Sequence, residues 1–188
     1  MDQAATDATL MARVAAGDRD AFAALIERHR EYVHKLAYRF VGRWDVADDL
    51  TQDAFLRVYR AAATYEPTAA FSTWLYRLVL NLCRDWRKGQ SYRKHAPLSD
   101  GLPGPDGGAD AVERQELAEV VRRAVEALPD HQREALILHR FAGLSHREIA
   151  AVMDKSESAV ESYITRGYAT LRAILAPQAR PRGRPQDG

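Results

Sequence analysis

The sequence predicts an all-α protein built from two small helical domains joined by a flexible linker. Apolar residues recur at intervals of three and four along most of the 188-residue chain, and no segment alternates apolar and polar residues as a half-buried strand does. Residues 97–108 are dense in proline and glycine, which cannot continue a helix. We therefore expect domains at residues 1–95 and 111–176, a linker at 96–110 and a disordered Pro/Arg-rich tail at 177–188.

The composition is that of a globular cytoplasmic protein. Hydrophobic residues make up 46% of the chain and charged residues 28%, with a net charge of +1, as in ordinary soluble domains. The single cysteine, Cys83, excludes an intramolecular disulfide. No apolar run reaches the roughly 18–20 residues that cross a membrane, and the N-terminus lacks the basic-then-apolar build of a secretory signal. We expect a cytoplasmic location and no membrane insertion.

Four helices account for the first domain. The apolar spacing places them at residues 7–16, 18–41, 45–62 and from 72 towards the linker. Gly17 and Gly42 end the first two, because glycine readily takes the left-handed conformation that closes a helix. Asp45 and Ser72 are the expected N-caps of the third and fourth helices. The fourth helix turns an apolar face inward, made by Leu75, Leu78, Val79, Leu82 and Trp86.

The sequence predicts four helices for the second domain as well. They are expected at residues 111–128, 130–141, 145–153 and 156–175. Pro129 ends the first, because the residue before a proline avoids the helical conformation. Ser145 and Glu148 have the spacing of a capping box. The last two helices form a helix-turn-helix pattern, with the small residue Ala150 at the crossing and Asp154 opening the turn.

A helix-turn-helix places its second helix in the major groove of DNA. Three basic residues accompany three acidic ones from Asp154 to Arg172, which gives little neutralisation of phosphates. Glu161 lies in mid-face and would be repelled by phosphates unless it accepts from a cytosine amine. We therefore expect weak binding to isolated DNA, and an ordinary helical hairpin with a solvated face is the alternative. The outward face consists of Glu157, Ser158, Glu161, Ser162, Thr165 and Arg166.

The third helix carries an acidic, polar patch made by Asp48, Asp49, Gln52 and Asp53. A solvated helix start explains such a patch, since acids favour the positive end of the helix dipole. Docking on a basic partner surface is the sharper interpretation. A magnesium site for diphosphate chemistry would need carboxylates from a second acidic helix, and the sequence has none. We expect neither a metal nor a cofactor.

The fourth helix combines bases with nearby aromatic rings. Its outward and terminal residues include Arg77, Asn81, Arg84, Arg87 and Lys88. The rings, Tyr65, Phe71 and Trp74, come just before it or in its first turn. This combination suits locally opened DNA, because rings stack on unpaired bases and cations follow the backbone. Alternatively, the rings form the core at a helix start.

Four segments, in a fixed order, then match a known family. They are Asp48-Asp-Leu-Thr-Gln-Asp-Ala-Phe55, Phe71-Ser-Thr-Trp-Leu-Tyr-Arg-Leu-Val-Leu-Asn81, Leu128-Pro-Asp-His-Gln-Arg-Glu-Ala-Leu136 and Gly143-Leu-Ser-His-Arg-Glu-Ile-Ala150. They strongly resemble the extracytoplasmic-function (ECF) sigma factors of bacteria, over residues 18–175 apart from the linker. The resemblance implies a sigma-two-like and a sigma-four-like domain. It also implies a subunit that directs RNA polymerase core to promoters and is not itself an enzyme.

The resemblance also implies partners and contacts. The partners are promoter DNA, an anti-sigma factor, and the beta-prime clamp helices and beta flap of the polymerase. The clamp helices would be bound by Asp48, Asp49, Gln52, Asp53 and Phe55. A flipped base and the backbone of the minus-ten element would be held by Tyr65, Phe71, Trp74, Arg77, Asn81, Arg84, Arg87 and Lys88. The minus-thirty-five element would be read by Ser156, Ser158, Ala159, Glu161, Ser162, Thr165 and Arg166.

Two features depart from the family's pattern or add to it. The recognition helix usually opens with a Thr-Val-basic-Ser-Arg run, and Ala159-Val-Glu-Ser-Tyr163 stands here instead. Two basic positions are lost, so an atypical upstream element is expected. The tail segment Pro181-Arg-Gly-Arg-Pro185 matches the core of an AT-hook, whose arginines enter a narrow minor groove. A solubilising tail is the alternative.

Two other functions stay open at this point. A stand-alone helix-turn-helix regulator would bind duplex DNA without polymerase, and it predicts a basic recognition helix that the sequence lacks. A sigma-like protein that sequesters polymerase is the other, because Glu161 and Tyr163 weaken the reading of DNA. Loss of Asp48, Asp49 and Asp53 separates them: it should abolish the function of a sigma factor or a sequestering protein but leave a stand-alone regulator active.

Overall fold

The computed structural model describes residues 5–92 and 109–176 of the chain, with side chains for 5–89 and 117–176. All regular structure in these ranges is helical, which confirms the all-α prediction. Most of the expected linker and the AT-hook segment lie outside the described residues. The elements are α1 (Asp7–Ala15), α2 (Arg19–Val41), α3 (Trp44–Ala61), η1 (Ala62–Thr64), α4 (Phe71–Tyr92), α5 (Ala109–Glu126), α6 (Asp130–Phe141), α7 (His146–Met153) and α8 (Glu157–Leu175).

Most helix ends follow the local signals in the sequence. Asp18 caps α2 by accepting from the backbone N–H groups of Asp20 and Ala21, at 2.9 and 3.0 Å. Gly42 closes the same helix with a φ of 73°, in the left-handed region that glycine adopts at little cost. Both halves of the capping box between Ser145 and Glu148 are present at the start of α7.

Two expected N-caps are displaced by two residues each. Arg43 occupies the N-cap of α3, without a side-chain cap, and Asp45 lies inside the first turn, where it pairs with the Arg43 guanidinium. That ion pair lowers the pKa of Asp45. The fourth helix begins at Phe71, so Ser72 also lies in a first turn. In both cases the polar residue still lies near the positive end of the helix dipole, but it is not the residue that caps the start of the helix.

The first domain is built around α2, which packs against α1, α3 and α4. Leu25 and Val33 of α2, Val58 of α3, and Leu75 and Leu80 of α4 have no exposed surface. Cys83 belongs to the same core, and burial raises the pKa of its thiol to about 12. The cysteine therefore serves as a small apolar side chain, as the sequence indicated.

The second domain depends on a close crossing of α6 and α8. Gly167 of α8 is buried there, and a Cβ added to it would lie 2.6 Å from Leu136 Cδ1 and 3.1 Å from Leu136 Cγ. Since Leu136 is itself 5% exposed, its side chain cannot swing into solvent. The glycine is therefore needed for helix contact, not for a backbone conformation.

Gly167→Ala and Gly89→Ala should have opposite effects on stability. Both glycines are in helices, so alanine gains about 0.5–1 kcal/mol of helix propensity at each. A Cβ at Gly89 meets nothing within 4 Å, whereas overpacking at Gly167 costs about 1–3 kcal/mol. We expect urea unfolding to rank Gly89→Ala above the parent and Gly167→Ala below it. Equal stability of the two variants would show that α6 and α8 can move apart to admit a Cβ at little cost in stability.

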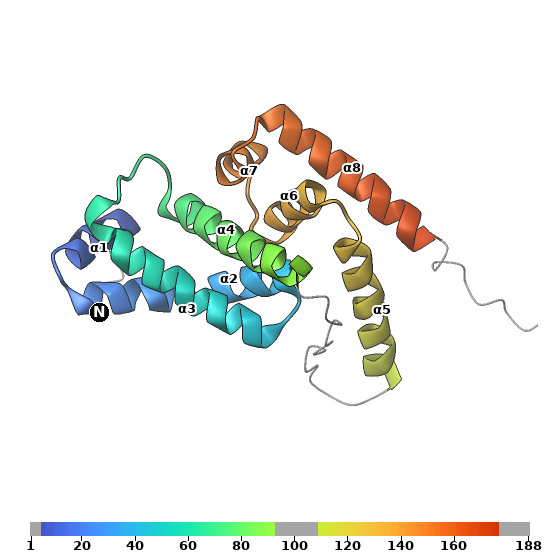
Figure 1. Ribbon diagram of the computed structural model, residues 1–188, viewed down its shortest axis with the longest axis horizontal. Helices are drawn as coiled ribbons and strands as arrows, with labels where there is room; N and C mark the ends of the chain where they lie inside the picture. The colour runs from blue at the N-terminus through green and yellow to red at the C-terminus, as the bar shows by residue number, and fades with distance from the viewer. Residues whose placement is uncertain (1–4, 93–108, 177–188) are drawn as a thin grey trace, which may run out of the picture.

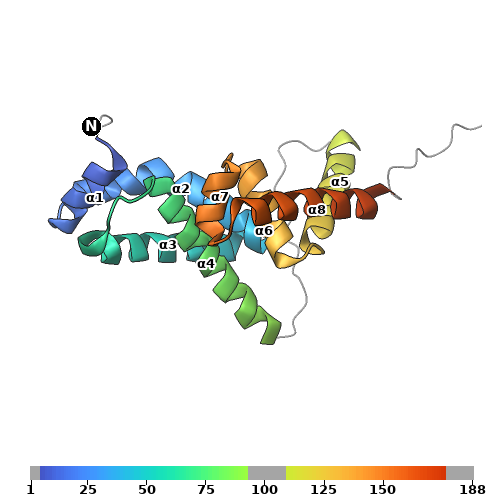
Figure 2. The same cartoon turned by 90° about the horizontal axis from the view of Figure 1, so that it is seen from above.

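The two domains lie side by side and share α4 as a boundary. Figure 1 shows α4 running between α2 and α3 on one side and α7 on the other, and Figure 2 shows its later part projecting away from the other helices. It packs against α2 and α3 on one side and against α7 on the other, and α2 also contacts α6. The buried apolar residues of both domains form one connected cluster. The outward surface of α4 is consequently divided between solvent and the second domain.

Candidate polymerase and nucleic-acid interfaces

The acidic patch on α3 is a solvent-exposed surface. Asp48, Asp49, Gln52 and Asp53 are all exposed. Asp48 Oδ1 lies 3.2 Å from His34 Nε2, and the His34 ring stacks on Trp44 at a centroid distance of 4.9 Å. The patch therefore stands on a packed aromatic support, while its carboxylates are available to a partner of opposite charge.

Phe55 does not belong to the surface of this patch. Its side chain is 5% exposed and packs in the core of the first domain, so it lies beneath the patch, and its contact with the clamp helices stays a prediction. The apolar side chains exposed next to the patch are Leu56 and Tyr59, at 50% and 46% exposure. Three- and four-residue spacing puts them on the same side of α3 as Gln52 and Asp53. Exposed aromatic side chains such as Tyr59 are enriched at protein interfaces, with polar groups at the rim.

Three aromatic rings cluster where the loop after η1 meets α4. Tyr65 lies edge-on to Phe71 and Trp74, at centroid distances of 5.9 and 5.1 Å. Phe71 is 5% exposed and also contacts His29 at 5.2 Å, so it supports the cluster from within and does not present a stacking surface. Tyr65 and Trp74 are half-buried. Burial, with a smaller contribution from Asp7, raises the pKa of Tyr65, which keeps it a neutral ring with an O–H donor.

The cations of α4 do not all point into solvent. Arg77 Nε donates to the Ala151 carbonyl at 3.0 Å, and a second N–H of the same guanidinium also reaches that oxygen. Arg84 donates to both carboxylate oxygens of Glu134 at 2.8 and 2.7 Å, which raises the Arg84 pKa. Both contacts join α4 to the second domain.

Arg87 differs from the outward orientation expected of it. Its guanidinium is half-buried and donates to the Phe40 carbonyl of α2 at 3.2 Å, and burial lowers its pKa. Asn81 and Lys88 are exposed as expected. Arg84 Nη1 also lies 3.4 Å from Asn81 Oδ1, so the amide and the guanidinium form one polar group on α4.

The helix-turn-helix has the geometry that its pattern predicts. Ile149, Ala150 and Met153 of α7 are buried with Val160 and Ile164 of α8. Asp154 takes a left-handed conformation with a φ of 57° in the turn. The Ser156 hydroxyl accepts from the Ala159 N–H at 3.2 Å, so this serine caps α8.

Most expected reading residues of α8 face outward. Ser158, Glu161, Thr165 and Arg166 are exposed, and Ala159 and Ser162 are half-buried. Tyr163 instead turns toward α6, with its ring 5.3 Å from that of His131. The tyrosine that replaces a family base is therefore part of the domain's packing.

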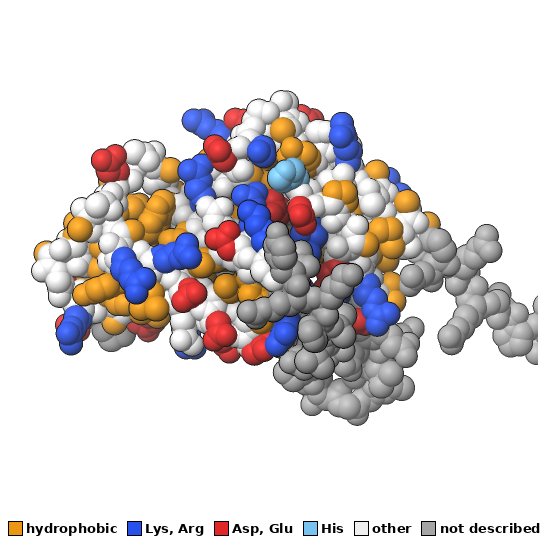
Figure 3. All heavy atoms as spheres, in the orientation of Figure 1, with side chains coloured by type: hydrophobic (Ala, Val, Ile, Leu, Met, Phe, Trp, Pro, Cys, Tyr) orange, Lys and Arg blue, Asp and Glu red, His pale blue; other side chains and the backbone are white. Residues whose placement is uncertain are grey.

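The space-filling view shows how these charges are distributed. In Figure 3, Lys and Arg side chains alternate with Asp and Glu side chains across the middle of this face. Among the described residues, no three His, Cys, Asp or Glu side chains are grouped to hold a metal ion. None of the described helices has the length and apolar character of a membrane span.

Comparisons with known proteins agree with this geometry. The family model for Sigma-70 region 2 matches residues 25–93, and that for Sigma-70 region 4 matches residues 118–171. The ECF RNA polymerase sigma-E factor of Escherichia coli K12 is 34% identical over 191 residues, covering 96% of this chain and all of the relative. The ECF sigma factor SigM of Mycobacterium tuberculosis H37Rv is 36% identical over 170 residues, covering 90% and 85%.

A solved structure extends the likeness to both domains. CnrH, in complex with the cytosolic domain of CnrY, is 31% identical and has a TM-score of 0.72, over 92% of this chain and 99% of that one. Two helical domains, one carrying an acidic face and an aromatic cluster and the other a helix-turn-helix, define a promoter-recognition protein. The chain belongs to the ECF RNA polymerase sigma factors.

Proposed function

We propose that this chain directs RNA polymerase core to its promoters through three surfaces. The acidic face of α3 docks on the beta-prime clamp helices. The aromatic cluster and α4 hold the opened minus-ten element, while α8 reads the minus-thirty-five element with its domain on the beta flap. The chain contributes binding and no catalysis of its own, and it works in the cytoplasm, where polymerase acts.

The observation that carries the proposal is that an exposed acidic cluster on α3 accompanies a second surface, on α4 and the loop before it, that carries cations and aromatic rings. Asp48, Asp49 and Asp53 of α3 are exposed, and among the described residues the one contact of these three carboxylates is that of Asp48 with His34. The cations and rings lie on α4 and the loop before it. A protein that bound DNA alone would not keep an acidic face beside its DNA surface, because phosphates repel carboxylates. A bridge between polymerase and DNA requires both.

The aromatic cluster is suited to a base that has left the duplex. Tyr65 and Trp74 each keep part of a ring exposed, over the buried ring of Phe71. Stacking of a base on an aromatic ring is worth about 1–3 kcal/mol, and a preorganised pair of rings loses little side-chain entropy on binding. Asn81 supplies donor and acceptor groups for the edge of a base.

Glu161 should limit the affinity of α8 for duplex DNA. Its carboxylate is exposed in the middle of the outward face, so Glu161→Gln removes a repulsion from phosphates. We expect the full chain to bind duplex DNA about 3–10-fold more tightly after this substitution, from the loss of one unfavourable charge. Fluorescence anisotropy in low salt measures the change, and Glu27→Gln on the exposed side of α2 is the matched control. A loss of affinity restricted to one sequence would instead identify Glu161 as a reader of cytosine.

We also propose an inhibitory partner, an anti-sigma factor. CnrH is described in complex with the cytosolic domain of CnrY, and this chain matches CnrH along nearly its whole length. An inhibitor that covers the surfaces of α3 or α4 would compete directly with polymerase or promoter DNA.

Promoter selection tests the proposal. Core polymerase would be mixed with the full chain and a library of DNA fragments, and the retained fragments sequenced. We expect two enriched elements at a fixed spacing, which appear only when both proteins are present. Enrichment by the chain alone would favour a stand-alone regulator, and retention of core without any enrichment would favour a sequestering protein.

A further inference from the structure

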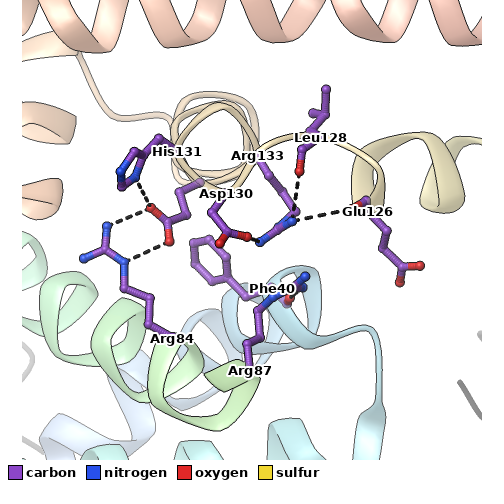
Figure 4. Close-up of polar contacts among 9 residues, drawn as sticks. Phe40, Arg84, Arg87, Glu126, Leu128, Asp130, His131 and Arg133 are labelled. Carbon is purple, nitrogen blue, oxygen red and sulfur yellow. Dashed lines mark hydrogen bonds and ion pairs between the residues drawn. The ribbon is translucent and has the colours of Figure 1, made fainter. Parts of the chain in front are cut away.

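The two ends of α4 are held by different parts of the chain. Figure 4 shows the later part, where Arg84 and Arg87 contact residues outside α4. Phe71, the first residue of the helix, lies roughly four turns away from them. These arginine contacts therefore do not orient the aromatic cluster of Tyr65, Phe71 and Trp74, and the cluster needs support from another element.

The short helix α1 supports the loop that leads into this cluster. It packs against α2 and against η1, the turn that ends just before Tyr65. Figure 1 shows α1 beside the end of α3, where the loop to α4 begins. Leu10 and Met11 of α1 have no exposed surface, so this helix is part of the core of the first domain. The start of the loop thus rests on a firmly packed element.

Asp7, in the first turn of α1, joins this helix to α2. One carboxylate oxygen accepts from Arg28 Nη1 at 2.6 Å, and the same nitrogen donates to the Ala5 carbonyl at 3.1 Å. The other oxygen lies 3.1 Å from His29 Nε2. Within the part of the chain that the structure describes, this buried nitrogen makes no hydrogen bond of standard geometry, so the carboxylate is its one polar partner. Because a buried polar atom without a partner is costly, the pairing holds His29 in place.

His29 extends this connection to the aromatic cluster. Its ring lies 5.2 Å from that of Phe71, and the Phe71 ring lies 5.9 and 5.6 Å from those of Tyr65 and Trp74. Burial raises the pKa of Tyr65, and the charge of Asp7 adds to that increase, so the carboxylate also lies near the tyrosine. Both ends of the loop from Tyr65 to Phe71 are therefore held by α1, one directly and the other through His29.

We propose that Asp7 and His29 are positioning residues for the capture of the minus-ten base. They do not touch DNA themselves. They hold the loop and the start of α4 so that Tyr65 and Trp74 keep the arrangement that receives the base. Rings that are already ordered lose less conformational entropy on binding than rings that the base must order. The inference rests on the proposed function of the aromatic cluster and adds α1 to the elements that this function needs.

The test compares two substitutions with a matched control in the full chain. Asp7→Asn removes the charge that pairs with Arg28 and His29. His29→Phe keeps a ring against Phe71 but cannot pair with Asp7. Asp20→Asn is the control, because Asp20 is an exposed acid in the first turn of α2 and its loss changes the net charge equally.

Two measurements separate positioning from a general loss of folding. Fluorine NMR of the free chain, labelled with fluorotryptophan, reports the surroundings of Trp74, whose signal is assigned with Trp74→Phe. Trp44 and Trp86 provide internal references. The second measurement adds core polymerase and a promoter with a fluorescent base analogue in the minus-ten element. It gives the equilibrium constant for promoter opening, and binding to core polymerase is titrated in parallel.

We expect Asp7→Asn and His29→Phe each to shift or broaden the Trp74 signal alone. Each should lower the equilibrium constant for opening about tenfold, the cost of ordering one or two side chains when the base binds. Binding to core polymerase should stay unchanged, and Asp20→Asn should alter none of these quantities. Parallel changes in all three tryptophan signals and in core binding would mean a loss of folding and overturn the positioning role.

The NMR result separates this inference from the function on which it rests. An unchanged Trp74 signal in either folded variant overturns the positioning role, whatever the chain does with polymerase. A changed signal with normal opening also overturns it, because the order of the rings would then not matter for the base. Failure of the parent chain to open any promoter would overturn the proposed function of the cluster, and this inference with it.

Discussion

Asp48→Lys, Asp49→Lys and Asp53→Lys together should abolish transcription directed by this chain. The three carboxylates are exposed on one helix, so their reversal places like charges against the basic surface proposed for the polymerase. Like-charge juxtaposition at an interface costs several kcal/mol, and about 1.4 kcal/mol is tenfold in affinity. We expect binding to core polymerase to fall by about 100-fold or more, as measured by co-elution and by titration of labelled protein.

The control for this prediction carries the same change of charge elsewhere. Asp20, Glu27 and Glu31 of α2 are also exposed, and their replacement by lysine alters the net charge identically without touching α3. This variant should bind core polymerase within about threefold of the parent, since exposed charges contribute little to stability. Equal loss in the two variants would mean that net charge, and not the α3 face, governs the interaction.

Tyr65→Leu with Trp74→Leu should block promoter opening while sparing attachment to polymerase. Leucine keeps apolar volume above Phe71 but offers no ring to an unpaired base. Loss of two stacking surfaces, each worth about 1–3 kcal/mol, predicts a decrease of about 100-fold in stable open complexes. A fluorescent base analogue in the minus-ten element reports the opening, and binding to core polymerase should stay unchanged.

Two comparisons limit the interpretation of that double variant. Phe71→Leu should cost folding stability and not opening at temperatures where the protein stays folded, because Phe71 is buried. Tyr168→Leu changes an exposed ring of α8 and should leave both quantities near those of the parent. Normal opening by the Tyr65/Trp74 variant would contradict the assignment of the aromatic cluster to the minus-ten base.

Local signals in the sequence predicted the helices and much of the candidate site. The capping box at Ser145 and the turn at Asp154 formed as expected, because both depend on interactions within a few residues. Helical spacing also placed Asp48, Asp49, Gln52 and Asp53 on an exposed surface. These features are set by the backbone geometry of a single helix.

The failures involve residues at the edges of helix faces and contacts between distant segments. Phe55 is placed at the polymerase contact by the family resemblance, which does not tell that its side chain packs inward. Leu56 is the reverse case, because it is an apolar residue that lies on the exposed side of α3. The burial of Arg87 against Phe40 and the pairing of Arg84 with Glu134 depend on tertiary packing. No periodicity within α4 encodes either contact.

Run-off transcription tests the central claim most directly. Core polymerase, the full chain and a promoter fragment obtained by selection would be combined, with the α3 lysine variant in parallel. The account predicts transcripts of one defined length that need both the chain and core polymerase and are lost with Asp48→Lys, Asp49→Lys and Asp53→Lys. Undiminished transcripts from that variant, or sequence-specific DNA binding by the chain alone with no transcripts at all, would contradict it.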